Sequence, residues 1–138
     1  MIKKILPIIL TCLFTFLFIS DSSANNLKAQ FTFSTFNSPA NGPYIETYLS
    51  VNGNSVIYQK YGENFQGVIE ITYVFKQGEE IKQFKKYNLL SPEIKDSSAI
   101  KLDFIDQQRI PLASGSYDFE IIIRDTNSVS TPFKTSQK

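Results

Sequence analysis

The residue types that the chain lacks restrict the chemistry it can perform. Its 138 residues contain no His, no Trp and a single Cys. Histidine-dependent triads, zinc sites with imidazole ligands and intrachain disulfides are therefore excluded. The sequence also contains no nucleophile elbow, P-loop, dinucleotide-binding or zinc-binding spacing. We therefore expect a protein that is not an enzyme, with no catalytic residue, no metal and no cofactor.

Two pairs of acidic residues are the remaining candidates for catalysis. Glu93 and Asp96 lie in a segment that contains Pro92, and Asp103 and Asp106 follow it. A glycosidase needs two carboxyl groups that face one cleft, one of them with a raised pKa. Here the first pair lies in a predicted loop, and Asp103 lies on the polar side of a predicted strand. We expect solvated acids, and the spacing does not match a calcium-binding loop.

Three tyrosines, Tyr44, Tyr48 and Tyr58, are the candidate binding residues. Tyr44 and Tyr48 fall on the face opposite Ile45 in a predicted strand. A hairpin predicted at Asn52-Gly53 brings Tyr58 across from that region. Exposed Tyr side chains on a sheet bind sugar rings or proteins, because they combine apolar area with a polar tip. The alternative is that this Tyr face packs on a second sheet and the Ile45 face is outside.

A lysine cluster, Lys82, Lys85 and Lys86, is the most basic part of the chain. Overall, 14 Lys and Arg residues against 13 Asp and Glu residues give a net charge of +1. Such a chain has no general attraction for nucleic acids or anionic membranes, and Glu79 and Glu80 precede the cluster. We therefore expect no nucleic-acid partner, and we interpret the lysines as protection of an edge strand.

The elements that position these side chains are predicted to be β-strands. Apolar and polar residues alternate with a period of two in segments separated by Gly, Pro and Asn, which is typical of strands joined by turns. The predicted strands are residues 30–36, 44–51, 55–61, 67–76, 81–89, 99–105 and 117–124, with a short last strand at 129–133. The fold class is therefore all-β, an antiparallel Ig-like or fibronectin-like β-sandwich of about seven to eight strands.

Two of these strands carry more specific expectations. Phe84 falls on the face opposite Ile81, which breaks strict alternation and predicts a β-bulge in residues 81–89. In residues 99–105, three alternating apolar residues are expected to face the core: Ile100, Leu102 and Phe104.

A tyrosine corner is predicted by Leu112, Gly115 and Tyr117, which form an L-x-x-G-x-Y pattern directly before the strand 117–124. In Ig-like sandwiches such a Tyr donates its hydroxyl to backbone a few residues upstream. The alternative is a loop glycine followed by the first residue of a strand.

The first 24 residues have the order of a secretory signal peptide. Lys3 and Lys4 precede an apolar run at residues 5–19, and small residues follow, with Ala24 before the expected cut. A second cleavage position follows residue 29. An uncleaved anchor is the alternative, but the run is shorter than the roughly 20 residues of a membrane span. We expect an exported chain that is periplasmic, cell-surface or extracellular, and that meets the membrane only through this peptide before cleavage.

The sandwich is expected to span residues 25–127, followed by a weak last strand or flexible tail at residues 128–138. Pro132 removes a backbone donor from this tail, and Pro is tolerated only at a sheet edge or bulge. If the tail does not pair, the strand 117–124 or its neighbour keeps an open edge. Such an edge is a template for self-association or for an envelope partner.

Several stretches resemble the N-terminal part of secreted Bacteroidetes proteins called GWxTD-domain-containing proteins. These stretches are residues 43–49, 75–78, 86–92, 104–109 and 112–117. The resemblance covers most of residues 30–125, but the chain has no Trp and so lacks the motif that names the family. The resemblance therefore implies an exported location and a β-rich module, and it carries over no functional residue.

The expected function follows from these observations. We expect an exported, non-enzymatic β-sandwich module that acts by binding or structural contact at the bacterial cell envelope, with an envelope protein or a glycan as partner. The alternative is a carbohydrate-binding module that uses the Tyr44, Tyr48 and Tyr58 face.

Overall fold

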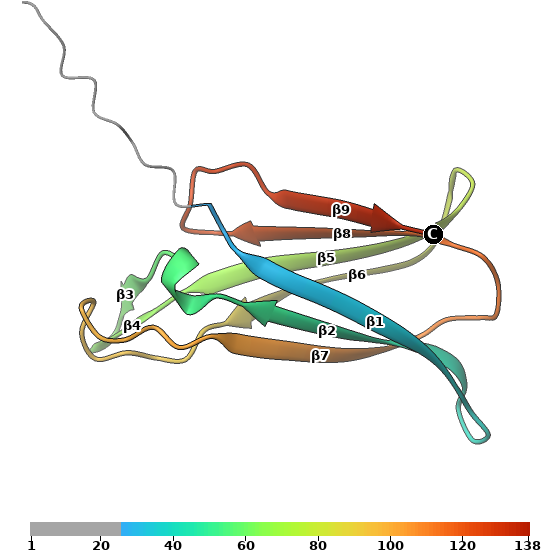
Figure 1. Ribbon diagram of the computed structural model, residues 1–138, viewed down its shortest axis with the longest axis horizontal. Helices are drawn as coiled ribbons and strands as arrows, with labels where there is room; N and C mark the ends of the chain where they lie inside the picture. The colour runs from blue at the N-terminus through green and yellow to red at the C-terminus, as the bar shows by residue number, and fades with distance from the viewer. Residues whose placement is uncertain (1–25) are drawn as a thin grey trace, which may run out of the picture.

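The computed structural model describes residues 26–138, and strands form most of this part of the chain (Figure 1). The predicted signal peptide at residues 1–24 lies outside the described residues. The strands are β1 (Ala29–Ser38), β2 (Gly42–Val51), β3 (Gln59–Tyr61), β4 (Asn64–Gln66), β5 (Val68–Gln77), β6 (Glu80–Leu90), β7 (Phe104–Pro111), β8 (Asp118–Asp125) and β9 (Phe133–Gln137). The regular helical structure within residues 26–138 is one 3₁₀ turn, η1 (Gly53–Ser55).

Two antiparallel sheets make up the body of the molecule. One has three strands in the order β1-β2-β7, and the other has four in the order β6-β5-β8-β9. The two sheets face each other across a shared core, and the small β3-β4 hairpin lies at one end (Figure 1). The prediction of an all-β antiparallel sandwich is confirmed, with nine strands in the described chain rather than about seven to eight.

The core is built from the inward face of each sheet. On β5, Ile69, Ile71, Tyr73 and Phe75 are fully buried because they alternate along a central strand. Phe119 of β8, in the same sheet as β5, is the centre of a layer of aromatic rings between the two sheets. Phe75 of β5 stacks on it at 4.2 Å, and the ring centroids of Phe31 and Phe33 of β1, in the opposite sheet, each lie 5.6 Å from that of Phe119.

The predicted hairpin at Asn52-Gly53 is wrong. β2 pairs with β1 and with β7, and Gly53 begins the 3₁₀ turn η1. A methyl group added at Gly53 would lie 2.2 Å from the carbonyl oxygen of Leu102. The Gly53 N–H also donates to the Asp103 carboxylate at 3.0 Å. Gly53 therefore permits a close approach to the loop before β7 rather than a positive-φ turn.

The predicted strand at residues 99–105 is also misplaced. β7 begins only at Phe104, which is buried, whereas Ile100 and Leu102 are 82% and 65% exposed. β7 then continues through residues predicted to form a loop. Asp106 faces the other sheet and Gln107 faces solvent, so polar residues occupy both faces of this strand and no apolar alternation marks it.

The predicted bulge is confirmed between β5 and β6. The register shifts after Phe75, so that Phe75 pairs with Gln83 while Lys76 pairs with Ile81. The extra residue reverses the side on which earlier residues of β6 lie. As a result Ile81 is 55% exposed while Tyr87 packs against the core, although strict alternation would place the two residues on one face.

The C-terminal segment contains a paired strand. β9 pairs antiparallel with β8 along five residues, from Phe133 opposite Ile123 to Gln137 opposite Phe119. This strand begins where the predicted one at residues 129–133 ends, and Val129 is fully exposed. β8 therefore has a neighbour on each side, β5 and β9, and the expected open edge at β8 does not exist.

Candidate functional site

The outer face of the β1-β2-β7 sheet holds two of the predicted tyrosines. Tyr44 and Tyr48 point away from the core, because Ile45 and Leu49, which directly follow them in β2, are 3% and 1% exposed. Tyr48 itself is 36% exposed. The alternative in which the Tyr face packs inside is therefore wrong. We call this surface the outer sheet face, defined by residues 30, 32, 34 and 36 of β1, 44, 46, 48 and 50 of β2, and 105, 107 and 109 of β7.

Tyr58 lies apart from this face. It precedes β3, is partly buried against the core, and has the Lys101 ammonium 5.2 Å from its ring centroid. The expected grouping of three tyrosines needed a hairpin at Asn52-Gly53, which the chain does not form. The structure therefore brings together Tyr44 and Tyr48 but not Tyr58.

Tyr44 is held between side chains from the two neighbouring strands. Phe36 pairs with Tyr44 across β1 and β2, and their rings stack at 5.3 Å with an interplanar angle of 20°. The Arg109 guanidinium lies 5.8 Å from the same ring. Because β1 and β7 flank β2 on opposite sides, the Tyr44 ring is supported from both. Its orientation is therefore fixed, and its exposed area is small.

Glu46 is the polar centre of the outer sheet face. Its carboxylate accepts hydrogen bonds from the Tyr48 hydroxyl at 2.5 Å, the Arg109 Nε at 2.7 Å and the Gln107 amide. The bond from Tyr48, and then that from Arg109, lowers the pKa of Glu46. The same bond raises the pKa of Tyr48, because deprotonation would place two negative charges side by side. The carboxylate is therefore ionised and fully engaged at neutral pH.

A shallow depression lies beside Tyr48 on the same face. Its volume is about 320 Å³, and its floor is the paired backbone of Phe31, Leu49 and Asp106. The side chains around it are those of Gln30, Thr32, Tyr48, Ser50, Ile105 and Gln107. Two amides, two hydroxyls, one aromatic ring and one exposed aliphatic side chain therefore surround a single hollow.

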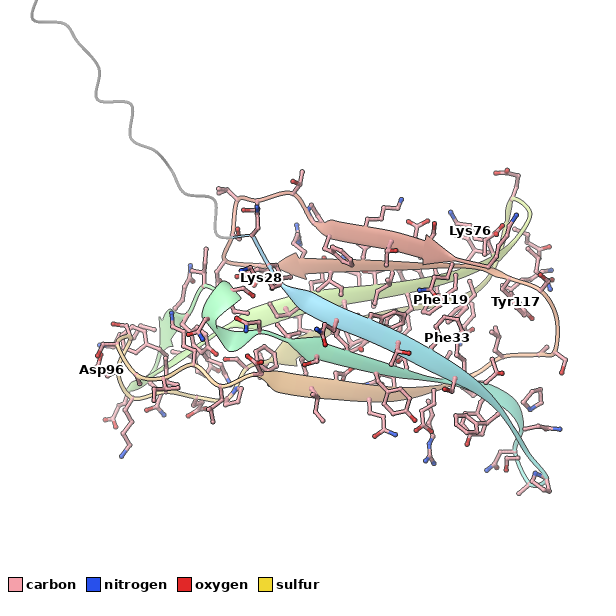
Figure 2. All side chains as sticks on the ribbon, viewed as in Figure 1. Lys28, Phe33, Lys76, Asp96, Tyr117 and Phe119 are labelled. Carbon is pink, nitrogen blue, oxygen red and sulfur yellow. The ribbon has the colours of Figure 1, made fainter. Side chains whose placement is uncertain are left out.

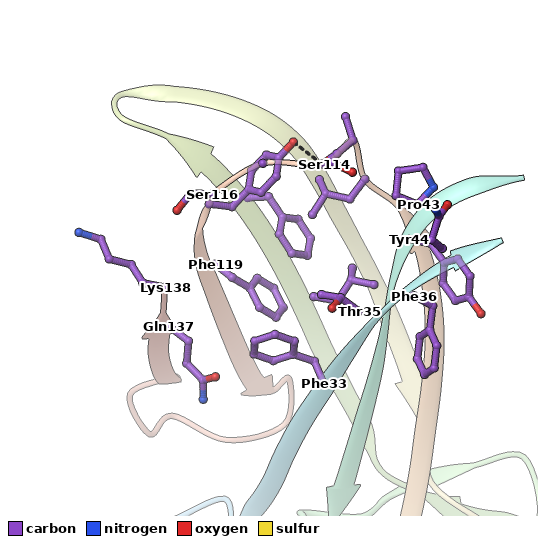
Figure 3. A pocket seen from close by; sticks show the side chains of 17 residues that line it. Phe33, Thr35, Phe36, Pro43, Tyr44, Ser114, Ser116, Phe119, Gln137 and Lys138 are labelled. Carbon is purple, nitrogen blue, oxygen red and sulfur yellow. Dashed lines mark hydrogen bonds between the residues drawn. The ribbon is translucent and has the colours of Figure 1, made fainter. Parts of the chain in front are cut away.

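The predicted tyrosine-corner residues lie at one end of the sandwich. The Tyr117 hydroxyl donates to the carbonyl oxygen of Ala113, four residues upstream, at 2.9 Å (Figure 3). The Leu112 N–H donates to the Pro43 carbonyl at 3.2 Å, which ties the β7–β8 loop to β2. A methyl group added at Gly115 would lie 2.8 Å from the Gln77 amide. Each residue of the pattern thus has a distinct contact that holds this loop.

Sequence reasoning missed a cavity at the same end. Its volume is about 680 Å³, and apolar side chains form most of its wall (Figure 3). The main contributors are Phe33, Ile45, Phe75, Leu112, Tyr117 and Phe119. They come from the β1-β2 hairpin, from β5 and from residues 112–119, so only the folded arrangement reveals the cavity. We call it the end cavity.

The four candidate carboxylates have separate structural roles. Glu93 accepts from the Asn64 amide at 2.6 Å, Asp96 accepts from the Ser98 N–H at 2.9 Å, and Asp103 holds η1. Asp96 lies at the end of the sandwich opposite Tyr117 (Figure 2). Within residues 26–138, no three or more His, Cys, Asp or Glu side chains gather as a metal site requires.

Asp106 belongs to a chain of polar side chains between the two sheets. It accepts hydrogen bonds from the Tyr87 hydroxyl and, at 2.8 Å, from the Gln108 amide, which in turn accepts from the Lys85 ammonium at 2.5 Å. The hydroxyl oxygens of Tyr87 and the buried Tyr73 lie 3.4 Å apart, so Tyr73 donates to Tyr87 when the single Tyr87 proton is directed at Asp106. Burial, followed by the bond to Asp106, raises the pKa of Tyr87. We call these residues the flank network, because β6 and β7 are edge strands.

The lysine cluster is divided among different partners. Lys82 pairs with Glu80 at 2.6 Å and Lys86 with Glu70 at 3.1 Å, while Lys85 belongs to the flank network. β6 is an edge strand, as the cluster predicts.

Comparison of the chain with protein-family models, with curated proteins and with solved structures gives no match. In the part of the chain that the structure describes, no helix is long and apolar enough to span a membrane.

Proposed function

We propose that the chain is an exported, non-enzymatic β-sandwich module that acts by binding or structural contact at the bacterial cell envelope. The observation that carries the proposal is the outer sheet face, where Tyr48 and Arg109 both bond to Glu46 and Phe36 stacks on Tyr44. Side chains that are already ordered lose little entropy on binding, and Tyr and Arg supply much of the binding energy at protein interfaces.

The sequence supports the location. A positive segment, an apolar run and small residues occupy positions 1–24 in the order of a signal peptide. The resemblance of residues 30–125 to the N-terminal module of GWxTD-domain-containing proteins points to the same compartment. The chain therefore acts in the periplasm, at the cell surface or outside the cell.

A carbohydrate is the second candidate ligand, and the depression beside Tyr48 favours it. Sugars present apolar C–H faces together with many hydroxyl groups, which match an aromatic ring surrounded by amides and hydroxyls. The ion pair of Glu46 with Arg109 leaves no net charge on that part of the face. A neutral glycan that contacts Tyr48, Thr32 and Gln107 therefore fits better than an acidic one, and Tyr58 takes no part.

Binding of the purified chain to a glycan array, and to envelope material from the source bacterium, tests the proposal. Tyr48→Ala removes the ring from the depression, and Tyr61→Ala is the matched control, because Tyr61 is 74% exposed in the β3-β4 hairpin. We expect Tyr48→Ala to abolish binding and Tyr61→Ala to retain it. Binding to an array glycan identifies a carbohydrate ligand, and binding to envelope protein alone identifies a protein. Equal binding by the two variants contradicts the proposal.

A further inference from the structure

The four edge strands of the two main sheets differ in how they are protected. β6 carries three lysines and a bulge, β7 carries Arg109 and ends at Pro111, and β9 is five residues long with Lys134 in it. Charges, prolines, bulges and short length are the means by which proteins prevent edge strands from pairing with other chains. β1 has none of them.

β1 is an unprotected edge over its whole length. It spans ten residues, AQFTFSTFNS, without a charged residue or a proline, and it pairs with β2 in ten consecutive positions without a register shift. Within residues 26–138, no strand pairs with its other side. In an antiparallel pair, alternate residues direct their N–H and C=O groups away from the partner, so half of the residues of β1 offer free backbone groups.

From these features we infer that β1 pairs antiparallel with β1 of a second copy of this chain, joining two three-stranded sheets into one six-stranded sheet. A second copy is the occupant that the charges favour. Pairing between two copies of one strand brings together strands of identical charge, and β1 alone among the four edges has no charge to repel.

The apolar pattern of β1 restricts the register. Odd-numbered residues face the core, as Phe31 and Phe33 show by their contacts with Phe119. Odd residues must therefore pair with odd residues, because a slip of one position would turn the apolar face of one copy to solvent. Pairing centred on Phe33 aligns residues 29–37 of both copies. It places Phe31 of the second copy opposite Thr35.

Pairing in this register would cover the open side of the end cavity. Thr35 faces inward opposite Ile45 and lines the cavity with Phe33, yet it is exposed. Figure 3 shows Phe33 and Thr35 on the β1 side of the cavity, opposite Phe119. An added strand would extend the β1-β2-β7 sheet on this side. Phe31 of the second copy would then cover an apolar cavity that the single chain leaves open.

Sedimentation velocity of the purified chain over a wide concentration range tests the inference. We expect a monomer–dimer equilibrium, with hydrogen exchange slowed in β1 at high concentration only. Thr35→Lys places a charge at a position that is exposed in the monomer and buried in the dimer, so it should weaken association at least about tenfold. Ser136→Lys places the same charge on the edge strand β9 and should leave association unchanged.

Three results would overturn the inference. One is a monomer at every concentration, and another is a dimer that Ser136→Lys weakens and Thr35→Lys does not. The third is a dimer whose β1 amides exchange at the same rate as in the monomer. Far-UV circular dichroism of each variant separates lost association from lost folding. If Thr35→Lys does not fold, the hydrogen exchange of the unmodified chain at two concentrations still decides the question.

Discussion

Removal of one hydroxyl from the flank network should destabilise the sandwich measurably. In Tyr87→Phe, the Asp106 carboxylate loses the Tyr87 donor and keeps only the Gln108 amide at 2.8 Å. A hydrogen bond to a charged group contributes about 1.5–3 kcal/mol, more than a neutral one, because loss of the donor leaves the charge poorly solvated. Since one donor remains, we expect a loss of about 2 kcal/mol in the free energy of unfolding.

Chemical and thermal unfolding, followed by circular dichroism, measure this loss. For a domain of this size the expected decrease in Tm is roughly 6–10 °C. Tyr61→Phe is the control, because Tyr61 is 74% exposed, and a surface change of this kind shifts stability by less than about 0.5 kcal/mol. Asp106→Asn combined with Tyr87→Phe should cost less than the sum of the two single variants, because the charge is then absent. Equal stability of Tyr87→Phe and Tyr61→Phe would refute the reasoning.

Three further predictions concern other contacts. Tyr117→Phe should lower the free energy of unfolding by about 1 kcal/mol, the net contribution of a neutral hydrogen bond such as that to Ala113. Urea unfolding measures the change, and a variant as stable as the unmodified chain would contradict the prediction. Gly53→Ala should destabilise by more than about 1 kcal/mol, because the added methyl group meets the Leu102 carbonyl, and a lower midpoint in the same assay checks it. The pKa of Glu46 is lowered on folding, so its contribution to stability is present above the unfolded value near 4.5 and is lost as the pH falls through the lower folded value. Glu46→Gln should therefore flatten the acid side of the stability–pH curve, and an unchanged curve would exclude this role.

The parts of the fold that the sequence predicts are those where burial and alternation coincide. β5 and β8 bury one face completely, so a large apolar residue recurs at every second position over most of each strand. β7 was not predicted over its full length because Asp106 and Gln108 replace apolar residues on its inward face, where the flank network satisfies them. A local sequence pattern cannot reveal that a polar residue faces inward when its hydrogen-bond partners lie on other strands.

The same limit explains what was missed at the candidate site. Alternation around Ile45 gave two opposite faces, one with Tyr44 and Tyr48, but it did not say which face is buried. Glu46 and Arg109 are 63 residues apart and meet only through the register of β2 with β7. At Asn52-Gly53 the local sequence favours a hairpin, but a tertiary contact, the hydrogen bond from the Gly53 N–H to Asp103, stabilises a different conformation.

Hydroxyl-radical footprinting of the chain, with and without envelope material from the organism that produces it, tests the central claim most directly. The method reports the solvent exposure of individual aromatic and aliphatic side chains. The account predicts protection of Phe36, Tyr48 and Ile105 on the outer sheet face, while Tyr61 and Phe84, which are 74% and 55% exposed elsewhere, stay reactive. Protection confined to Tyr61 or Phe84, or no protection at saturating envelope material, would contradict the claim that this face binds the partner.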